Sequence, residues 1–453
     1  MRVLKYLLGT GFVLSAAVAQ GQITLSESMQ HAIRSAKQKS ESLKNKQIEI
    51  KKLQLQQKEV RDKRLPNLNI KGGYVFVDSK SSIDIEPVQT PILGLPLFTG
   101  EQNSTFQTHT AFAGVNAQVV LFSGMQIPYA QKALEQKRIG TEYLNETATD
   151  DLVQEVIVSF DQIQVLNAVQ SLINESQKRL EVEEKRVQRS IEEGFAIPLD
   201  KDKIRLAQLE LQSKQVELDG SQRLIRKKIV YLTGLSEAEI EQVANDFQPF
   251  ILAEENTNIE EKSQVKALTA FMNAQDFLLK KEKSTLLPQV VLMGGLRYTN
   301  FFDAKLPIGG SHLQLNHATF FPTTYVGVGV NWKIFNGNER SHKMKQVKMD
   351  MEILKNTLSD TKQKLELLLH KNSENYRVAN EKLKLNQQKV QVAQNNLNIA
   401  IKQFKEGLID ISERLQIEND YHKVMIEQAQ GIQQQRQAAL ELAKVQGKLQ
   451  YIN

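Results

Sequence analysis

The sequence contains one long pattern twice, and this duplication constrains the fold more than any single motif does. In the first copy, Gly124 ends the stretch Leu-Phe-Ser-Gly and is followed seventy positions later by Gly194. In the second copy, Gly337 ends Ile-Phe-Asn-Gly and is followed seventy positions later by Gly407. The two glycine pairs have the same offset in numbering (337 − 124 = 407 − 194 = 213). Such spacing predicts two copies of one supersecondary unit.

The N-terminal stretch 1–19 has the composition of a secretory signal peptide. Arg2 and Lys5 precede a short apolar run, and Ala17 and Ala19 form a small-residue cleavage site. That run is shorter than the ~20 residues of a spanning helix, and no other stretch reads as apolar enough to cross a bilayer as a helix. The chain has no cysteine, which excludes disulfides and thiolate metal sites. The mature chain is therefore predicted to be exported.

The charge pattern does not predict a nucleic-acid partner, although the formal net charge is +6. Basic and acidic residues alternate closely, as in residues 181–186, instead of gathering into patches. Interspersed signs are typical of solvated helix faces. Only 41% of the residues are hydrophobic, which is low for several packed cores.

Two proline-free windows, residues 129–197 and 323–453, predict long helices, because proline costs ~3 kcal/mol inside a helix. Mostly apolar residues recur every seven positions in both windows: Leu152, Ser159, Leu166, Ile173, Leu180 and Val187, then Leu369, Tyr376, Leu383, Val390, Leu397 and Phe404. A seam of this period predicts left-handed coiled-coil packing. Shorter helices are expected over residues 24–64, 197–232, 260–287 and 410–450.

Four stretches with period-two alternation predict strands, at about residues 69–78, 112–122, 289–299 and 325–335. Alternation over about ten residues is typical of transmembrane β-barrel strands, and the alternative is a half-buried strand of a soluble sandwich. Fourteen of the 29 aromatic residues lie in 74–122 and 298–335, as in membrane-interface girdles. Residues 78–111 and 302–324 carry five prolines and predict long exposed loops.

The four strands cannot close a barrel by themselves. Open sheet edges are not tolerated in lipid, so the chain is expected to supply one sector of a barrel built by several copies with cyclic symmetry. The predicted organisation is a signal peptide (1–19), a first repeat (20–232), a connector (233–259) and a second repeat (260–453).

Motifs for catalysis are not found in the sequence. The seven histidines form no His-Glu-x-x-His pattern, and His312 and His317 lie in a predicted loop. The glycine pairs at 294–295 and 309–310 lack the context of a phosphate-binding loop. An enzyme is therefore not expected, and neither is a catalytic or cofactor site or a metal.

In this order of elements, the chain resembles the TolC family of outer-membrane efflux proteins. The matching pieces are Leu-Pro-Asn-Leu and Leu-Pro-Gln-Val before strands, Leu-Phe-Ser-Gly and Ile-Phe-Asn-Gly before helices, and Glu-Gly-Phe and Glu-Gly-Leu at the predicted helix tips. The resemblance covers essentially the whole mature chain. It implies a mainly α fold with a small β part, in which long coiled α-hairpins form a periplasmic α-barrel and four strands join a trimeric, 12-stranded outer-membrane β-barrel.

The resemblance also implies a function. A homotrimer in the outer membrane would be the exit duct of a tripartite efflux or type I secretion system, receiving substrate from an inner-membrane pump through a periplasmic adaptor protein. The substrate, whether drug, metal, lipid or protein, is left open. The alternative is an exported coiled-coil scaffold or adaptor without a pore, which explains the heptads but not four strands at matched positions.

The family has a periplasmic gate of acidic residues just beyond the tip glycine, and the matching positions are acidic here. Asp200 lies six positions after Gly194, and Glu413 lies six positions after Gly407. A trimer would gather six carboxylates around a narrow mouth. The alternative is that both acids only complement a helix dipole.

Three further residues follow from the same comparison. Phe404 stands where the family often has a tyrosine that ties the gate by a hydrogen bond, which phenylalanine cannot form. The tip residues Phe195 and Leu408, with the glycines that precede them, are expected to face the adaptor.

Overall fold

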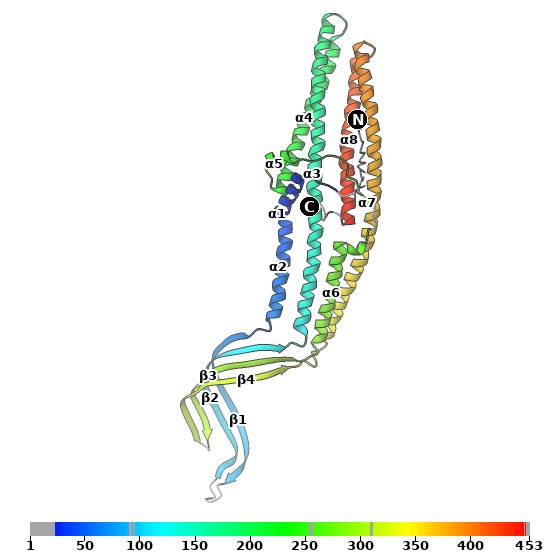
Figure 1. Ribbon diagram of the computed structural model, residues 1–453. Coiled ribbons are helices and arrows are strands. Elements are labelled where there is room, and N and C mark those ends of the chain that lie inside the picture. Colours follow the sequence, from blue (N-terminus) through cyan, green and yellow to red (C-terminus); the bar gives the residue numbers. More distant parts are fainter. Residues whose placement is uncertain are drawn as a thin grey trace, which may run out of the picture. The chain divides into compact units, whose positions relative to one another are not determined.

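Helices and strands follow one another in the same order in both halves of the chain (Figure 1). The computed structural model describes residues 23–89, 93, 96–252, 257–308, 311–447 and 449; the predicted signal peptide lies outside them. The chain divides into two units. Unit 1 contains Met1–Glu49, Thr141–Leu268 and Thr357–Asn453, and unit 2 contains Ile50–Gly140 and Thr269–Asn356.

The predicted duplication is present in the structure. The helices are α1 (Glu27–Lys39), α2 (Glu41–Asp62), α3 (Gln126–Glu192), α4 (Pro198–Thr233), α5 (Glu237–Gln242), α6 (Ser263–Ser284), α7 (Glu339–Lys405) and α8 (Ile411–Gln446). Helices α3 and α7 each have 67 residues, and α4 and α8 each have 36. Both pairs repeat the offset found between the glycines (339 − 126 = 411 − 198 = 213).

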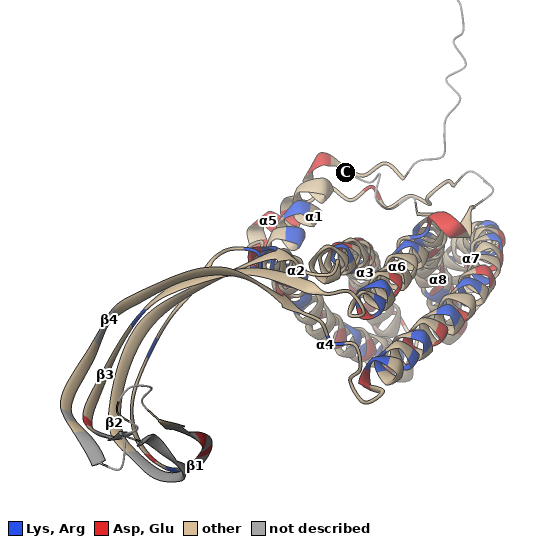
Figure 2. Cartoon of the chain, turned by 90° about the horizontal axis from the view of Figure 1, so that it is seen from below, with Lys and Arg blue, Asp and Glu red and all other residues tan. Residues whose placement is uncertain are grey.

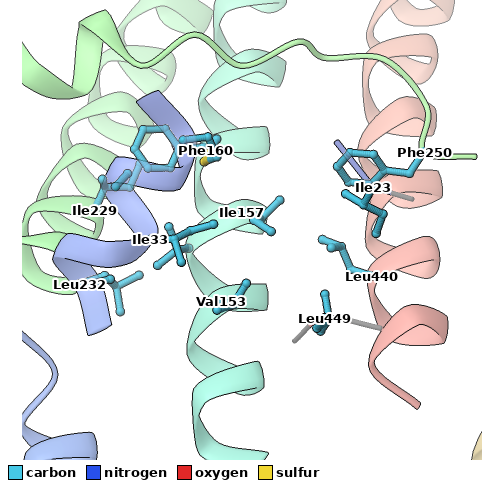
Figure 3. Close-up of a cluster of buried hydrophobic side chains, with 14 of the residues drawn as sticks. Ile23, Ile33, Val153, Ile157, Phe160, Ile229, Leu232, Phe250, Leu440 and Leu449 are labelled. Carbon is cyan, nitrogen blue, oxygen red and sulfur yellow. The ribbon is translucent and has the colours of Figure 1, made fainter. Parts of the chain in front are cut away.

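Unit 1 is held together by an apolar core that joins both repeats (Figure 3). Ile157 and Phe160 of α3 pack with Ile229 of α4 and Leu440 of α8. The residues of both predicted heptad seams are buried or half-buried, as coiled-coil packing requires. One stretch of α3 is apolar enough to cross a membrane, contrary to the sequence expectation, but half of it is buried within the protein. We assign it to the core.

The predicted connector contains α5 and then an extended segment that crosses the second repeat. The Phe250 N–H donates to Gln435 Oε1 at 3.0 Å, and Tyr376 Oη donates to the Phe250 carbonyl at 3.0 Å. Arg436 of α8, itself buried, lies over the Phe250 ring at 3.7 Å. These bonds satisfy the buried backbone of the segment and fix it across α7 and α8.

Unit 2 contains one antiparallel sheet in the order β1-β2-β3-β4. Its strands are β1 (Asn67–Gln89), β2 (Pro96–Phe122), β3 (Gln289–Ile308) and β4 (Ser311–Asn331). The register aligns Ile70 with Val115 and Val115 with Leu296 on one face. The opposite face carries polar groups, and Tyr325 Oη donates there to Asn116 Oδ1 at 2.7 Å. The predicted alternation is therefore confirmed.

The strands are much longer than the sequence predicted. Most of 78–111 and 302–324, expected as loops, belongs to paired strands. The prolines suggested loops, but three of them lie where a sheet tolerates proline. Pro87 and Pro322 lie in the outer strands β1 and β4 of the described sheet, beside register shifts, and Pro96 is the first residue of β2. The fourth strand was also misplaced, because β4 ends at Asn331 instead of continuing to 335.

Charged residues are distributed differently over helices and strands. Figure 2 shows acidic and basic residues interspersed along the helices, whereas the strand segments nearest to them carry few. The predicted interspersion of charge is therefore visible on the helix faces. The adjoining half of the sheet has the composition of a surface that faces lipid.

Helices α3 and α6 of unit 2 approach closely because α3 has a glycine at the contact. A Cβ atom on Gly140 would lie 2.6 Å from the Phe271 ring. Inside a helix, alanine is normally more stable than glycine by about 1 kcal/mol. At this position the added methyl group would clash with the packed Phe271 ring. Glycine therefore sets the helix separation at this point.

We expect Gly140→Ala to destabilise the protein by about 1–3 kcal/mol, as overpacking does. The measurement is Tm of the purified protein in mild detergent. Gly140→Ala combined with Phe271→Leu, which makes room for the methyl group, should recover most of the loss. A higher Tm for the single variant would contradict this account of the contact.

Candidate functional site

The turn between α3 and α4 is a Schellman motif centred on a glycine. Gly194 has φ of +77°, a conformation that other residues resist. The Phe195 N–H donates to the Ser190 carbonyl at 2.7 Å, and the Gly194 N–H donates to the Ile191 carbonyl at 3.1 Å. These two bonds satisfy carbonyls at the end of α3 and reverse the chain.

The turn between α7 and α8 has the same structure. Gly407 has φ of +71°; the Leu408 N–H donates to the Gln403 carbonyl at 2.9 Å, and the Gly407 N–H donates to the Phe404 carbonyl at 3.2 Å. The residue after each glycine usually packs back onto its helix in this motif. Here Phe195 and Leu408 are 83% and 71% exposed. Both hairpins therefore present an apolar side chain at the tip.

Asp200 and Glu413 occupy equivalent places, each as the third residue of the helix after a tip. Asp200 Oδ2 accepts the Ile197 N–H at 3.4 Å, and Oδ1 lies 3.7 Å from Lys203 Nζ. Glu413 is exposed, and its backbone N–H donates to Asp410 Oδ1 at 3.0 Å. Asp200 therefore caps its own helix, whereas Asp410 caps the second helix and leaves the Glu413 side chain in solvent.

Phe404 packs into an apolar cluster at the base of the two tips. Leu180, Val187, Ile204 and Ile411 are its buried members, and they come from α3, α4 and α8. Phe404 of α7 is half-buried against them. Its side chain therefore helps to hold the two hairpins together by apolar contact, without a hydrogen bond.

The structure also brings together a group of residues that the sequence reading missed. Arg179 and Ser176 of α3 meet Glu418, His422 and Arg414 of α8 in the interior between the two repeats. Arg179 and Glu418 are 239 positions apart, so no local motif marks them. One signal was available, because Glu418 stands seven positions after the buried Ile411, where a heptad seam would be apolar. Within the described residues, no group of three or more His, Cys, Asp or Glu side chains could hold a metal ion.

Comparison with known proteins identifies the architecture. Residues 259–448 match the family model described as outer membrane efflux protein. No curated protein is similar enough in sequence to count as a relative. Among solved structures, a membrane protein from Pseudomonas aeruginosa has a TM-score of 0.72 at 15% identity, covering 96% of this chain and 98% of that one.

Two further structures have the same fold over nearly the whole chain. The Campylobacter jejuni CmeC outer membrane channel has a TM-score of 0.69 at 12% identity, covering 99% of this chain and 94% of that chain. The outer membrane protein VceC from Vibrio cholerae has a TM-score of 0.67 at 14% identity, covering 92% and 96%. At these identities the likeness concerns the fold.

Asp410→Ala is expected to lower Tm near pH 7, because α8 loses the acceptor for the Glu413 N–H. That N–H holds the pKa of Asp410 below its ordinary value of 3.8. A carboxyl with a lowered folded-state pKa stabilises the protein above its unfolded pKa, and this contribution is lost as pH falls. The Tm difference from wild type should therefore shrink below about pH 4. Asp410→Asn, which keeps an acceptor, is the control; a full difference persisting at low pH would contradict the cap.

Proposed function

The chain belongs to the outer membrane efflux protein family, and from this premise we propose that it works as a homotrimeric exit duct. The family consists of efflux channels of the outer membrane that act in tripartite systems, and it is not enzymatic. The resemblance to TolC-like proteins in the sequence is thereby confirmed. The proposal adds the number of copies, the contact between them, the gate and the docking end.

The observation that carries the proposal is an uncovered heptad seam on α7. Val378, Leu385 and Val392 recur every seven positions, and all three are exposed. The equivalent positions of the first repeat lie on α3, where Leu172 packs against Tyr421 of α8. Leu172 is 8% exposed, whereas its counterpart Leu385 is 57% exposed. The surface that α3 buries against α8 is therefore exposed at the equivalent positions of α7.

Helix α4 has the complementary uncovered surface. Val216 is 70% exposed, whereas Ala429, its counterpart on α8, is 7% exposed. Leu209 is also exposed, although its counterpart His422 lies against α3. The contact between α3 and α8 within one chain is thus a template for a contact between α7 of one copy and α4 of the next. A head-to-tail contact of this kind forms a ring when its rotation closes after a whole number of copies.

The sheet supports the same arrangement. β1 and β4 are the outer strands of the described sheet, and unpaired strand edges are not stable in lipid. Pairing β1 of one copy with β4 of the next removes every edge. Two copies would give eight strands, a barrel that side chains fill, whereas three give twelve and leave a channel. The alternative of a scaffold without a pore leaves the apolar face of the sheet unexplained.

The remaining assignments concern the far end of the hairpins. The exposed Phe195 and Leu408 favour docking of a periplasmic adaptor at the tips, which would link the duct to an inner-membrane pump. Asp200 and Glu413, at matched places beside the tips, favour an acidic ring at the entrance. Phe404 holds the hairpins together beneath that ring.

We expect Leu385→Glu combined with Val392→Glu to prevent trimer formation, because carboxylates would be buried between copies. Light scattering after size-exclusion chromatography in mild detergent measures the mass. Gln391→Glu, an exposed change on a different face of the same helix, should leave the trimer intact. A trimer in the double variant, or a monomeric wild type, would refute the assignment.

Replacing Asp200 and Glu413 together by alanine should reduce the preference for cations in planar-bilayer recordings and weaken block by multivalent cations. A ring of carboxylates attracts cations and offers them oxygen ligands. The Asp200→Asn, Glu413→Gln pair removes the charge but keeps hydrogen-bonding groups, and it should change selectivity equally. If selectivity is unaltered and only Tm falls, the two acids act on helix stability alone and no ring exists.

A further inference from the structure

Glu418 of α8 is a buried carboxylate held by arginines from both repeats. It is 3% exposed. Arg179 Nε, from α3, donates to Glu418 Oε1 at 2.6 Å, and Arg414 Nη2, from α8, lies 2.9 Å from Glu418 Oε2. Arg179 Nη1 continues to Glu175 Oε1 at 2.7 Å. Charges so well buried persist only when they are paired, so the contact depends on this geometry.

His422 lies one turn further along α8 and completes the network. Its Nε2 atom is 3.0 Å from Arg179 Nη2 and 2.9 Å from Ser176 Oγ. A guanidinium can only donate, so Nε2 must accept. The imidazole is therefore neutral in this arrangement, with its proton on Nδ1. A second proton on Nε2 would face the guanidinium and break the bond.

The network is incompletely satisfied on the α8 side. Arg414 is 1% exposed, and its Nε and Nη1 atoms have no hydrogen-bond partner in the described structure. A half-satisfied buried network is costly in a low-dielectric interior. Separating α3 from α8 at this contact therefore costs less free energy than separating an apolar contact of the same size.

The counterpart positions in the other repeat are apolar. The equivalent of Arg179 is Val392 (179 + 213), and the equivalent of His422 is Leu209 (422 − 213). Both belong to the surfaces assigned above to the contact between copies. At this level the two kinds of contact around the ring thus differ in chemistry, since the contact within each chain is ionic and the proposed contact between chains is hydrophobic.

We propose that the α3–α8 contact is the one that opens when the entrance widens, that Glu418, Arg179 and His422 are positioning residues that keep it closed, and that acid releases it while the contacts between copies stay packed. The proposal rests on the proposed function, because it needs an entrance and neighbouring copies.

The sign of the pH effect follows from the groups around His422. Burial lowers the pKa of His422, and Arg179 of α3 and Lys214 of α4 act in the same direction; Glu418 of α8 and Glu175 of α3 oppose them. Arg414 of α8 pairs with Glu418 on its other oxygen. Because the pKa is below the ordinary value of 6.5, protonation favours the open contact. The contact is therefore strongest above about pH 6.5 and weakens as pH falls.

The first test compares single-channel conductance of the trimer at about pH 7.5 and about pH 5.5. Wild type should show a severalfold rise on acidification, and His422→Leu, which installs the residue found at position 209, should show none. Glu418→Gln should conduct at the higher pH as wild type does at the lower. The Asp200→Asn, Glu413→Gln pair should keep the rise, which separates this network from the acidic ring. A conductance of wild type that does not change with pH overturns the proposal.

The second test uses disulfides, since the natural chain has no cysteine. Leu172→Cys with Tyr421→Cys, both within one buried cluster, locks the α3–α8 contact; oxidation should abolish the acid response and reduction should restore it. The counterpart pair, Leu385→Cys with Gln208→Cys, should link copies into a covalent trimer and leave the acid response unchanged. An acid response that survives the first lock, or disappears with the second, overturns the proposal. Failure of the second pair to link copies refutes the proposed trimer contact instead.

Discussion

The outer edges of β1 and β4, which have no partner strand among the described residues, are the constraint on which the rest of the molecule depends. A backbone N–H or C=O group cannot remain unpaired in lipid, and four strands are too few to close a barrel. The chain therefore needs other copies of itself before its sheet can be stable in a membrane. The helices of an assembly must obey the same rotational symmetry as its strands, and the proposed contact between the exposed faces of α4 and α7 would do so in the same head-to-tail way.

Because the chain is duplicated, a ring of copies can be built from one kind of helix contact. Because α3 and α7 have equal length, and α4 and α8 do as well, the three chains of the proposed trimer would supply six nearly equivalent hairpins. A contact that works within a chain can then work between chains, provided that the side chains suit it. The connector breaks this equivalence, because it occurs once in the chain and its Phe250 is bound to Gln435 and Tyr376 of the second repeat.

The parts of the fold that depend on local sequence could be predicted, and the parts that depend on distant residues could not. The long helices and the glycines at 194 and 407 follow from proline-free windows and from their spacing. Strand length did not follow, because the far ends of β1 and β2 are polar and contain prolines that only the pairing makes acceptable. The acids at 200 and 413 were found by their matched positions, but their different capping roles depend on Ile197 and Asp410, which differ between repeats. The ionic network joins α3 to α8, and its one trace along the sequence is Glu418, a carboxylate where a heptad seam would be apolar.

The different chemistry of the two contacts has a physical reason. Copies that meet by diffusion lose translational and rotational freedom on assembly. In the proposed trimer, burial of apolar side chains such as Leu385 and Val216 would offset that loss without demanding exact geometry. Helices α3 and α8 belong to one chain and are already joined by the core around Ile157 and Leu440, so their contact near the tips does not need to drive association. The contact can therefore be polar and exact in geometry, and its closed and open states can be close in free energy. A contact whose closed and open states are close in free energy is one that a single proton on His422 can shift, whereas the proposed contact between copies centres on apolar side chains such as Leu385 and Val216.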